Sequence, residues 1–312
     1  MRVFSKALLG AAAIFFGLST AASADATRVV FVTHGQAADQ YWSVVKRGVD
    51  DAGKTMGVTA EYLAPETFDM PSMARLLEAA IASKPDGLVV SIPDTDAIGP
   101  LVQNAVGAGI PVIVIDSGGS ELSRKLGALL YMGQSEFDAG VLAGERVKAL
   151  GAGKAVCVNH EVGNISLDDR CAGFAKGLGA EVPVLQGVMD PTEMKGRILA
   201  HLQANADTQF ILTVGSAGAD PALAAVDEAG LAGKIKLGTF DLSPTILEAV
   251  DGGRMEWGID AQQYLMGYIP VVMFDLMKRY KLMPIIDYPT GPGFVTKAAA
   301  ASVIDLAKQG VR

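Results

Sequence analysis

The sequence predicts an α/β protein of two Rossmann-like lobes, each with a parallel sheet and joined to the other by a multi-crossover hinge. From residue 29 onward, short β-branched runs alternate with longer stretches of helical periodicity, which is the pattern of repeated βαβ units. A glycine-containing turn precedes a strand-like run at residues 108–111 and again at 229–231, so the two halves look alike. Glycine-rich segments at 117–120 and 289–293 are predicted to be crossovers, because glycine absorbs the backbone rotation of a hinge.

The expected elements alternate along the whole chain. The helix at 41–56 carries Trp42, Val45 and Val49 at helical spacing and ends at Gly57. The helix at 70–82 ends before a Lys-Pro-Asp-Gly turn that leads into the next strand. Strands are expected at 29–33, 59–62, 87–91 and 112–115 in the first half, and at 156–159, 184–186, 210–214, 236–240 and 255–260 in the second.

Residues 1–24 are predicted to be a secretory signal peptide. Arg2 and Lys6 precede an apolar run, which is followed by Ala22-Ser23-Ala24, a small-residue cleavage pattern. The apolar run is well below the ~20 residues that a transmembrane helix needs. The mature chain is therefore expected to begin near Asp25 and to be exported.

The charge of the chain argues against nucleic acid as a partner. Without the two basic residues of the signal peptide, the chain has 24 basic and 34 acidic side chains, a formal charge near −10. Half of all residues are hydrophobic and 6% are aromatic, which excludes a disordered or fibrous chain.

The two cysteines, Cys157 and Cys171, lack the C-x-x-C spacing of zinc or thioredoxin-type sites. In an exported protein an even pair favours a disulfide, although two buried thiols remain the alternative. A catalytic cysteine is not expected.

Motifs for catalysis and for cofactors are also lacking. The segment around Ser216 has Val214 where a nucleophile elbow needs glycine. The Gly-Ala-Gly-Lys run at 151–154 precedes a strand and lacks the P-loop length. The three histidines form neither H-x-H nor H-E-x-x-H. We therefore predict a protein that is not an enzyme and that has no metal and no cofactor.

Polar residues cluster just after the predicted strands, where open α/β sheets bind their ligands. Carboxylates, amides and guanidinium groups can bond two neighbouring hydroxyls of a sugar, and aromatic rings can pack on its C–H faces. The candidate ligand-binding residues are His34, Gln36, Asp39, Tyr41, Trp42, Ser91, Asp94, Asp116, Gln134, Glu136, Asn159, Arg170, Ser216, Asp241, Asp260 and Gln262.

Several candidates have a structural alternative. Tyr41 and Trp42 could pack in the core at the start of their helix. Asp116 could cap the following Ser-Gly-Gly turn. Arg170 could pair with Asp168 or Asp169, which precede it. His34 could bond either a ligand or a neighbouring loop.

Four sequence landmarks carry a resemblance to a known family. They are 33–42 (THGQAADQYW), 85–93 (PDGLVVSIP), 108–116 (AGIPVIVID) and 238–241 (GTFD). In this order and spacing they resemble the type I periplasmic sugar-binding proteins, the ribose-binding-protein group. The resemblance covers essentially the whole mature chain, and the segments 262–264 (QQY) and 291–297 (GPGFVTK) are similar to those of members described as sugar or polyol transporters.

The resemblance implies a fold, a role and a location. The N-terminal lobe would comprise 25–132 plus 264–290, and the C-terminal lobe 133–263 plus 291–312. The protein would bind a monosaccharide or sugar alcohol between the lobes in the periplasm and present it to the ABC transporter permease of the inner membrane. Ile92, Ser117 and Ala261 depart from the residues that ribose-binding members commonly have, so a ribose pocket is not expected to be copied intact.

Other functions remain open on the sequence. A cationic or furanosyl signal ligand would exploit the excess of acidic candidates over Arg170. The loaded protein could also signal to a chemoreceptor. The sensor core of a transcription factor shares this fold, but the signal peptide stands where its DNA-binding segment would be.

Overall fold

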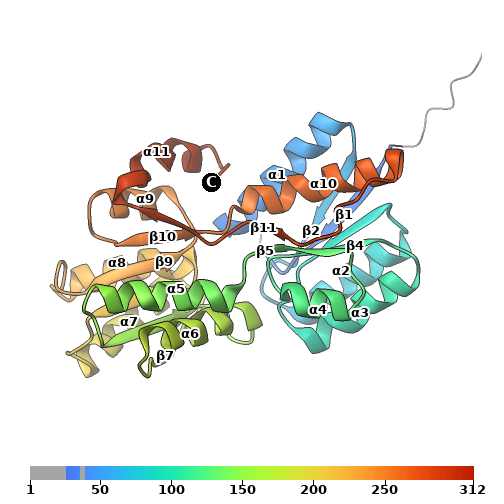
Figure 1. Ribbon diagram of the computed structural model, residues 1–312. Helices are drawn as coiled ribbons and strands as arrows, with labels where there is room; N and C mark the ends of the chain where they lie inside the picture. Colours follow the sequence, from blue (N-terminus) through green and yellow to red (C-terminus); the bar gives the residue numbers. More distant parts are fainter. Residues whose placement is uncertain (1–25, 36–38) are drawn as a thin grey trace, which may run out of the picture.

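The computed structural model describes residues 26–35 and 39–312 and contains two α/β lobes, each built on a six-stranded sheet (Figure 1). The predicted signal peptide lies outside the described residues. The strand order is β11-β5-β4-β3-β1-β2 in the first sheet and β12-β10-β9-β8-β6-β7 in the second. Every neighbouring pair is parallel, as predicted, except β10 and β12, which pair antiparallel at one edge of the second sheet.

Most strands form where the sequence predicts them, because buried β-branched runs mark central strands of a parallel sheet. The first sheet consists of β1 (Arg28–Val32), β2 (Thr59–Leu63), β3 (Gly87–Val90), β4 (Val112–Ile115), β5 (Leu130–Gly133) and β11 (Tyr288–Pro289). The second consists of β6 (Ala155–Asn159), β7 (Val184–Gln186), β8 (Phe210–Thr213), β9 (Lys236–Phe240), β10 (Trp257–Asp260) and β12 (Gly293–Thr296). The sequence prediction missed β5, β11 and β12.

Helices cover both faces of the first sheet. One face packs against α1 (Gln40–Met56) and α10 (Gln263–Tyr280) through a core that includes Phe31, Val49 and Phe274. The other face packs against α2 (Met70–Ala82) and α3 (Thr95–Gly107) through Val32 and Leu77 among others. The short helix α4 (Gly119–Lys125) contacts β4 and β5.

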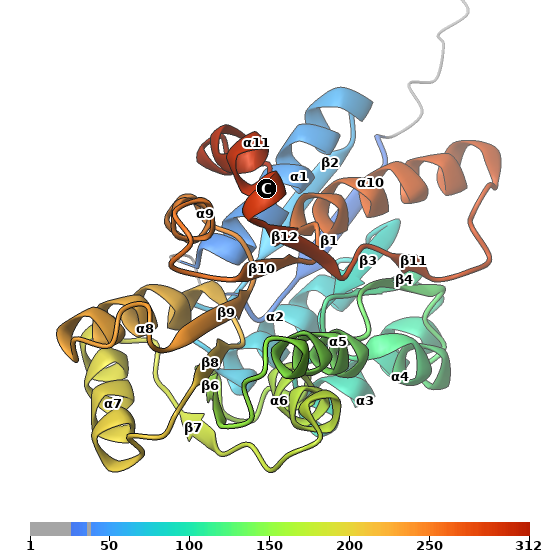
Figure 2. The same cartoon turned by 60° about the vertical axis from the view of Figure 1, so that its left-hand side comes forward.

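The second lobe has the same three-layer plan. Its helices are α5 (Glu136–Ala149), α6 (Ile165–Leu178), α7 (Pro191–Ala204), α8 (Ser216–Glu228), α9 (Pro244–Asp251) and α11 (Lys297–Lys308). Helices α5 and α6 pack on one face, and their backbones approach closely because Gly140 and Gly173 carry no side chain at the contact. The remaining four helices cover the other face (Figure 2).

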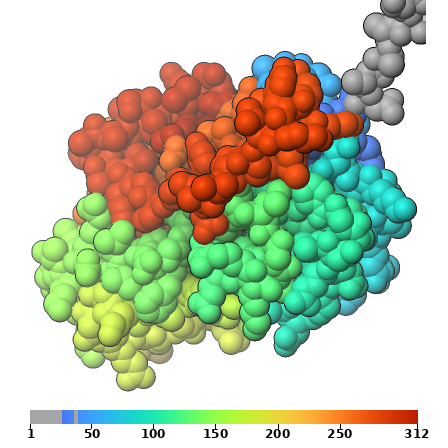
Figure 3. All heavy atoms as spheres, turned by 45° about the vertical axis from the view of Figure 1, so that its right-hand side comes forward, coloured from blue at the N-terminus to red at the C-terminus, as the bar shows by residue number. Residues whose placement is uncertain are grey.

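The chain passes between the lobes three times. The passages lie between β5 and α5, between β10 and α10, and between β11 and β12. The predicted crossover at 289–293 is thereby found, whereas the one predicted at 117–120 is wrong. Gly118 and Gly119 have φ angles of 111° and 68° and turn the chain into α4 within the first lobe. Figure 3 shows the orange-red late part of the chain lying directly against the green part of the first half.

Cys157 on β6 and Cys171 on α6 form a disulfide, with their Cα atoms 5.8 Å apart. The predicted bond is therefore confirmed and the alternative of two buried thiols is wrong. Both cysteines are buried, and the bond ties α6 to the sheet beneath it. This fixes the helix that carries Arg170.

Candidate functional site

A polar cavity, with about 370 Å³ of empty space when the open solvent at its mouth is included, lies between the carboxyl ends of the strands of the two sheets. The first lobe lines it from the ends of β1 and β4 and the start of α1, and the second lobe from the ends of β6, β8 and β9 and the start of α6. Its lining residues are His34, Asp39, Tyr41, Trp42, Asp116, Ser117, His160, Glu161, Asn164, Ser166, Leu167, Arg170, Ser216 and Asp241.

Asp241 follows β9 and presents an unpartnered carboxylate oxygen to the cavity. The residue is 5% exposed, its φ is 69°, and its Oδ2 accepts a hydrogen bond from the backbone N–H of Ser216 at 3.3 Å. Its Oδ1 has no hydrogen-bond partner and lies 3.9 Å from Nη1 of Arg170. A buried acceptor without a partner is costly, so a donor from a bound molecule would be favourable here.

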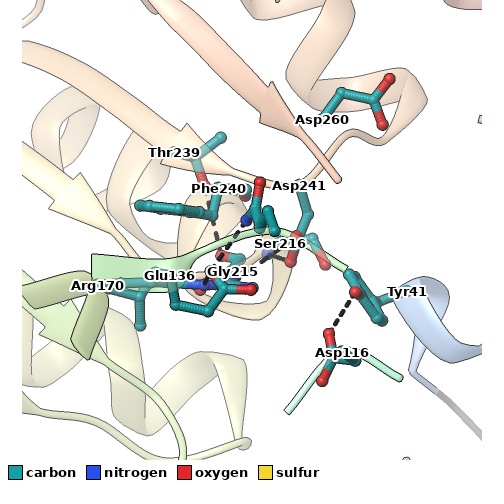
Figure 4. A network of polar contacts seen from close by, with 12 residues as sticks. Tyr41, Asp116, Glu136, Arg170, Gly215, Ser216, Thr239, Phe240, Asp241 and Asp260 are labelled. Carbon is teal, nitrogen blue, oxygen red and sulfur yellow. Dashed lines mark hydrogen bonds and ion pairs between the residues drawn. The ribbon is translucent and has the colours of Figure 1, made fainter. Parts of the chain in front are cut away.

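Arg170 is held by Glu136 and not by its sequence neighbours. Its Nε and Nη2 donate to the two carboxylate oxygens of Glu136 at 2.6 and 3.0 Å, and Nη1 donates to the carbonyl oxygen of Val214 at 2.7 Å. The guanidinium also lies over the ring of Phe240, 4.5 Å from its centroid (Figure 4). The predicted alternative of a pair with Asp168 or Asp169 is wrong, because the fork of the guanidinium is turned toward α5.

The first lobe contributes a phenol and a carboxylate that are joined to each other. The hydroxyl of Tyr41 donates to Oδ1 of Asp116, and Ser117 Oγ donates to Oδ2 at 2.7 Å (Figure 4). Asp116 has a φ of 60°, which directs its side chain into the cavity and not along the turn. Asp39 caps α1, where its Oδ1 accepts from the N–H of Tyr41 at 2.8 Å.

Tyr41 and Trp42 meet both expectations, contact with the cavity and packing in the core. Tyr41 and Trp42 belong to the core that α1 shares with the first sheet, yet both also line the cavity. The ring of Trp42 packs edge-on against His34, with 4.7 Å between their centroids. The first turn of α1 therefore contributes side chains to both the core and the cavity.

His160 lies in the second wall and its Nδ1 has no hydrogen-bond partner. Its ring fits because Gly215 has no side chain: a Cβ there would come within 2.4 Å of the imidazole. Glu161 and Asn164 follow, joined by a 2.9 Å hydrogen bond from Asn164 Nδ2 to Glu161 Oε2.

Burial controls the protonation of the cavity. It raises the pKa of Asp241 to about 8, that of Glu161 to about 7 and that of Asp39 to about 6. It lowers the pKa of His34 to about 4 and that of His160 to about 3. Both imidazoles are therefore neutral at pH 7, while the carboxyl groups offer a mixture of donors and acceptors.

The structure brings eight of the predicted site residues to the cavity: His34, Asp39, Tyr41, Trp42, Asp116, Arg170, Ser216 and Asp241. Gln36 lies outside the described residues.

Seven predicted site residues have other roles. Ser91 bonds the ring of His34 at 2.8 Å, and Asp94 caps α3. Gln134 donates to Glu136, which holds Arg170. Asn159 bonds Asp168 and the N–H of Glu161.

The last two lie at the hinge. Asp260 pairs with Arg312 at 2.7 Å, and Figure 4 shows it apart from the cluster around Asp241. Gln262 donates to the carbonyl oxygen of Thr290 at the neighbouring crossover.

Sequence reasoning missed six lining residues: Ser117, His160, Glu161, Asn164, Ser166 and Leu167. Five of them lie in the segment that joins β6 to α6 or in the first turn of that helix. Open α/β sheets bind ligands beyond the carboxyl ends of their strands, so site residues are expected in this segment. The segment is too long for the sequence alone to show which of its side chains face the cavity.

No helix within 26–35 and 39–312 combines the length and the apolar character needed to span a bilayer. In the same residues, no three or more histidine, cysteine, aspartate or glutamate side chains are grouped to hold a metal ion.

Known proteins share this architecture. A family described as "Periplasmic binding protein domain" matches residues 29–280. The chain is 24% identical over 291 residues to the xylose/arabinose-binding protein XylF of Sulfolobus acidocaldarius, covering 87% of this chain and 71% of that protein. It is 30% identical over 196 residues to the D-ribose/D-allose-binding protein of Pseudomonas aeruginosa, covering 60% and 61%.

Solved structures agree. A carbohydrate transporter from Acidothermus cellulolyticus, solved in complex with myo-inositol, is 31% identical, has a TM-score of 0.87, and is matched over 92% of this chain and 100% of its own. The predicted fold and the resemblance to type I periplasmic sugar-binding proteins are thereby confirmed. The chain belongs to the periplasmic binding protein domain family.

Proposed function

We propose that the protein is the exported solute-binding component of an ABC-type importer. It binds one monosaccharide or sugar alcohol between its lobes in the periplasm and presents it to the permease of the inner membrane. Family membership over residues 29–280 supports this role. Relatives named for xylose and arabinose, for ribose and allose, and a structure with bound myo-inositol support a polyhydroxylated ligand.

The observation that carries the proposal is the polar cavity whose walls come from both lobes. A monosaccharide needs several donors and acceptors on each side and one surface for its C–H groups. Asp241 and Arg170 face the cavity from the second lobe, and Asp116 and Trp42 from the first. A bound ring would touch both walls, so that binding and closure would be coupled.

We further propose that the lobes move as the predicted bodies, 25–132 plus 264–290 and 133–263 plus 291–312. The three crossovers are the segments that such a motion must bend, and Gln262 at the second of them already has a φ of 54°. The permease would recognise the closed arrangement of the lobes. A chemoreceptor could recognise the same arrangement.

The cavity does not favour catalysis. The hydroxyl of Tyr41 is engaged with Asp116. Ser91 Oγ lies 2.8 Å from Nδ1 of His34, but Ser91 is fully buried and does not line the cavity. A nucleophile needs both a base within hydrogen-bond reach and access to the ligand. We therefore propose binding and transport, and no turnover of the ligand.

A thermal-shift screen tests the proposal. The purified mature chain is heated with pentoses, hexoses, alditols and inositols, and with spermidine and free amino acids as other ligand classes. A ligand that binds only the folded state raises the midpoint. We expect at least one sugar, alditol or inositol to do so with one-to-one stoichiometry by calorimetry. A response to spermidine or amino acids alone would contradict the proposal.

A further inference from the structure

Both walls of the cavity carry carboxyl groups. The first lobe contributes Asp39 and Asp116, and the second contributes Glu161 and Asp241. Three of the four are at most 6% exposed. Residues 36–38, which lie outside the described part of the chain, are Gln-Ala-Ala and add no charge. Closing the lobes therefore brings carboxyl groups toward carboxyl groups.

The positive charge of Arg170 is already paired with the carboxylate of Glu136. Among the described lining residues Arg170 is the one lysine or arginine, and its two hydrogen bonds to Glu136 neutralise it. The imidazoles of His34 and His160 add no positive charge at pH 7, since burial lowers the pKa of each to about 4 and about 3. The lining therefore holds four carboxyl groups and one guanidinium, which is already bonded to Glu136 and lies 3.9 Å from Asp241.

Like charges in a low-dielectric space are unfavourable, and the protein relieves them by taking up protons. Burial, with Asp39 and Asp116 adding to it, raises the pKa of Asp241 to about 8. Asp39 and Asp116 belong to the first lobe and Asp241 to the second, so the carboxyl groups of the two lobes lie in the same cavity. A ligand with a positive charge would relieve the same repulsion, and the carboxyl groups would then not need to take up protons.

We propose that the ligand is a polyhydroxylated ring that carries one amino group, an aminocyclitol or an amino sugar, whose ammonium lies against Asp241. The proposal rests on the proposed function and narrows its ligand class. Asp241 Oδ1 is the buried acceptor that lacks a hydrogen-bond partner, and Arg170 Nη1, at 3.9 Å, is beyond hydrogen-bond distance. An ammonium supplies three donors and the missing charge.

The rest of the cavity matches hydroxyl groups and not a second cation. Ser166 and Arg170 place donors in the same cavity, and donors need acceptor oxygens that a polyamine does not have. Trp42 offers an apolar edge for a ring. The combination fits one ammonium and several hydroxyls on a compact ring.

Calorimetry on matched pairs tests this assignment. The protein is titrated at pH 7 with myo-inositol and an inosamine, with galactose and galactosamine, and with glucose and glucosamine, which differ by a hydroxyl replaced by an ammonium. We expect the amine to bind at least about tenfold more tightly than its neutral partner in one pair. Asp241→Asn should bring that ratio toward one, whereas the exposed Asp251→Asn should leave it unchanged.

Asp39→Asn is a second variant, because asparagine caps a helix as well as aspartate while the charge is lost. It should reduce the ratio as well. Neutral members that bind as tightly as their amines in all three pairs, or an Asp241→Asn variant that weakens both members of the preferred pair equally, would overturn the assignment and leave the proposed function standing. Failure of every pair and of the whole sugar and polyol screen would reject the proposed function itself.

Discussion

His34 and Asn164 contact each other across the cleft, with 3.3 Å between Nε2 of the imidazole and Nδ2 of the amide. His34 follows β1 in the first lobe, and Asn164 is the N-cap of α6 in the second. A backbone hydrogen bond of 3.1 Å from Ile165 N to Pro93 O crosses the same boundary. These contacts join the lobes directly, so the structure describes a closed arrangement.

The contact predicts that His34→Ala releases ligand faster. The closed state loses a bond between the lobes, so the dissociation rate should rise several-fold, which stopped-flow displacement of bound sugar would measure. Ser91→Ala is the matched control, because Ser91 bonds the same imidazole at 2.8 Å within the first lobe and does not cross the cleft. Equal dissociation rates for His34→Ala and the unchanged protein would contradict the role of the contact.

Asp241→Asn should weaken ligand binding without destabilising the empty protein. A lost hydrogen bond to a charged group costs roughly 1.5 to 3 kcal/mol, which corresponds to about tenfold to a hundredfold in Kd. The carboxylate is buried and one oxygen is unpartnered, so its removal should leave the melting temperature of the empty protein equal or higher. Calorimetry and thermal unfolding measure the two effects. An unchanged Kd would place the ligand elsewhere.

Arg170 and Glu136 should behave as one unit in unfolding. Arg170→Met leaves a buried carboxylate unpaired, which typically costs about 3 to 5 kcal/mol in the free energy of unfolding. The double variant Arg170→Met with Glu136→Met should recover most of that loss, because no unpaired charge remains. Neither variant should bind ligand well, since the guanidinium is gone. Urea unfolding gives the stabilities, and a double variant as unstable as the single would contradict the pairing.

The sequence predicted the fold well where the signal was local. All nine predicted strands form: most are buried apolar runs inside a sheet, and β2 and β7 are partly exposed edge strands. The run Leu-Tyr-Met-Gly of β5 has no β-branched residue to predict a strand, and β11 has two residues and pairs with β5 from a distant part of the chain. A glycine pair such as Gly118 and Gly119 does not distinguish a crossover from the start of a helix, because both need the same freedom of the backbone.

The site residues likewise divide into those that a local sequence signal predicts and those that no local signal predicts. Asp116 and Asp241 follow directly from their positions after β4 and β9. The pairing of Arg170 with Glu136, which are 34 residues apart, is set by how α5 packs on α6 and leaves no local signal. His160 and Glu161 stand in the connection that leaves β6, where sequence alone does not tell which side chains turn toward the cavity.

Removing the disulfide should lower the stability of the fold and weaken ligand binding only slightly. Replacing both Cys157 and Cys171 by alanine opens a loop with a sequence separation of 14, for which the expected loss is roughly 2 to 4 kcal/mol in the free energy of unfolding. Chemical unfolding of oxidised and variant protein measures it. Because α6 carries Arg170, a small loss of affinity is expected as well. Equal stabilities would show that the bond adds nothing to the fold.

Small-angle X-ray scattering tests most directly whether ligand holds the two lobes together. The mature protein is measured without ligand and with a saturating amount of the sugar or polyol that gives the largest thermal shift, with Asp241→Asn treated in parallel. We predict that the bound protein is more compact than the empty one, that its scattering curve matches the closed arrangement, and that Asp241→Asn needs more ligand to reach it. Identical curves for empty and saturated protein would contradict the account, because ligand would then favour neither arrangement of the lobes.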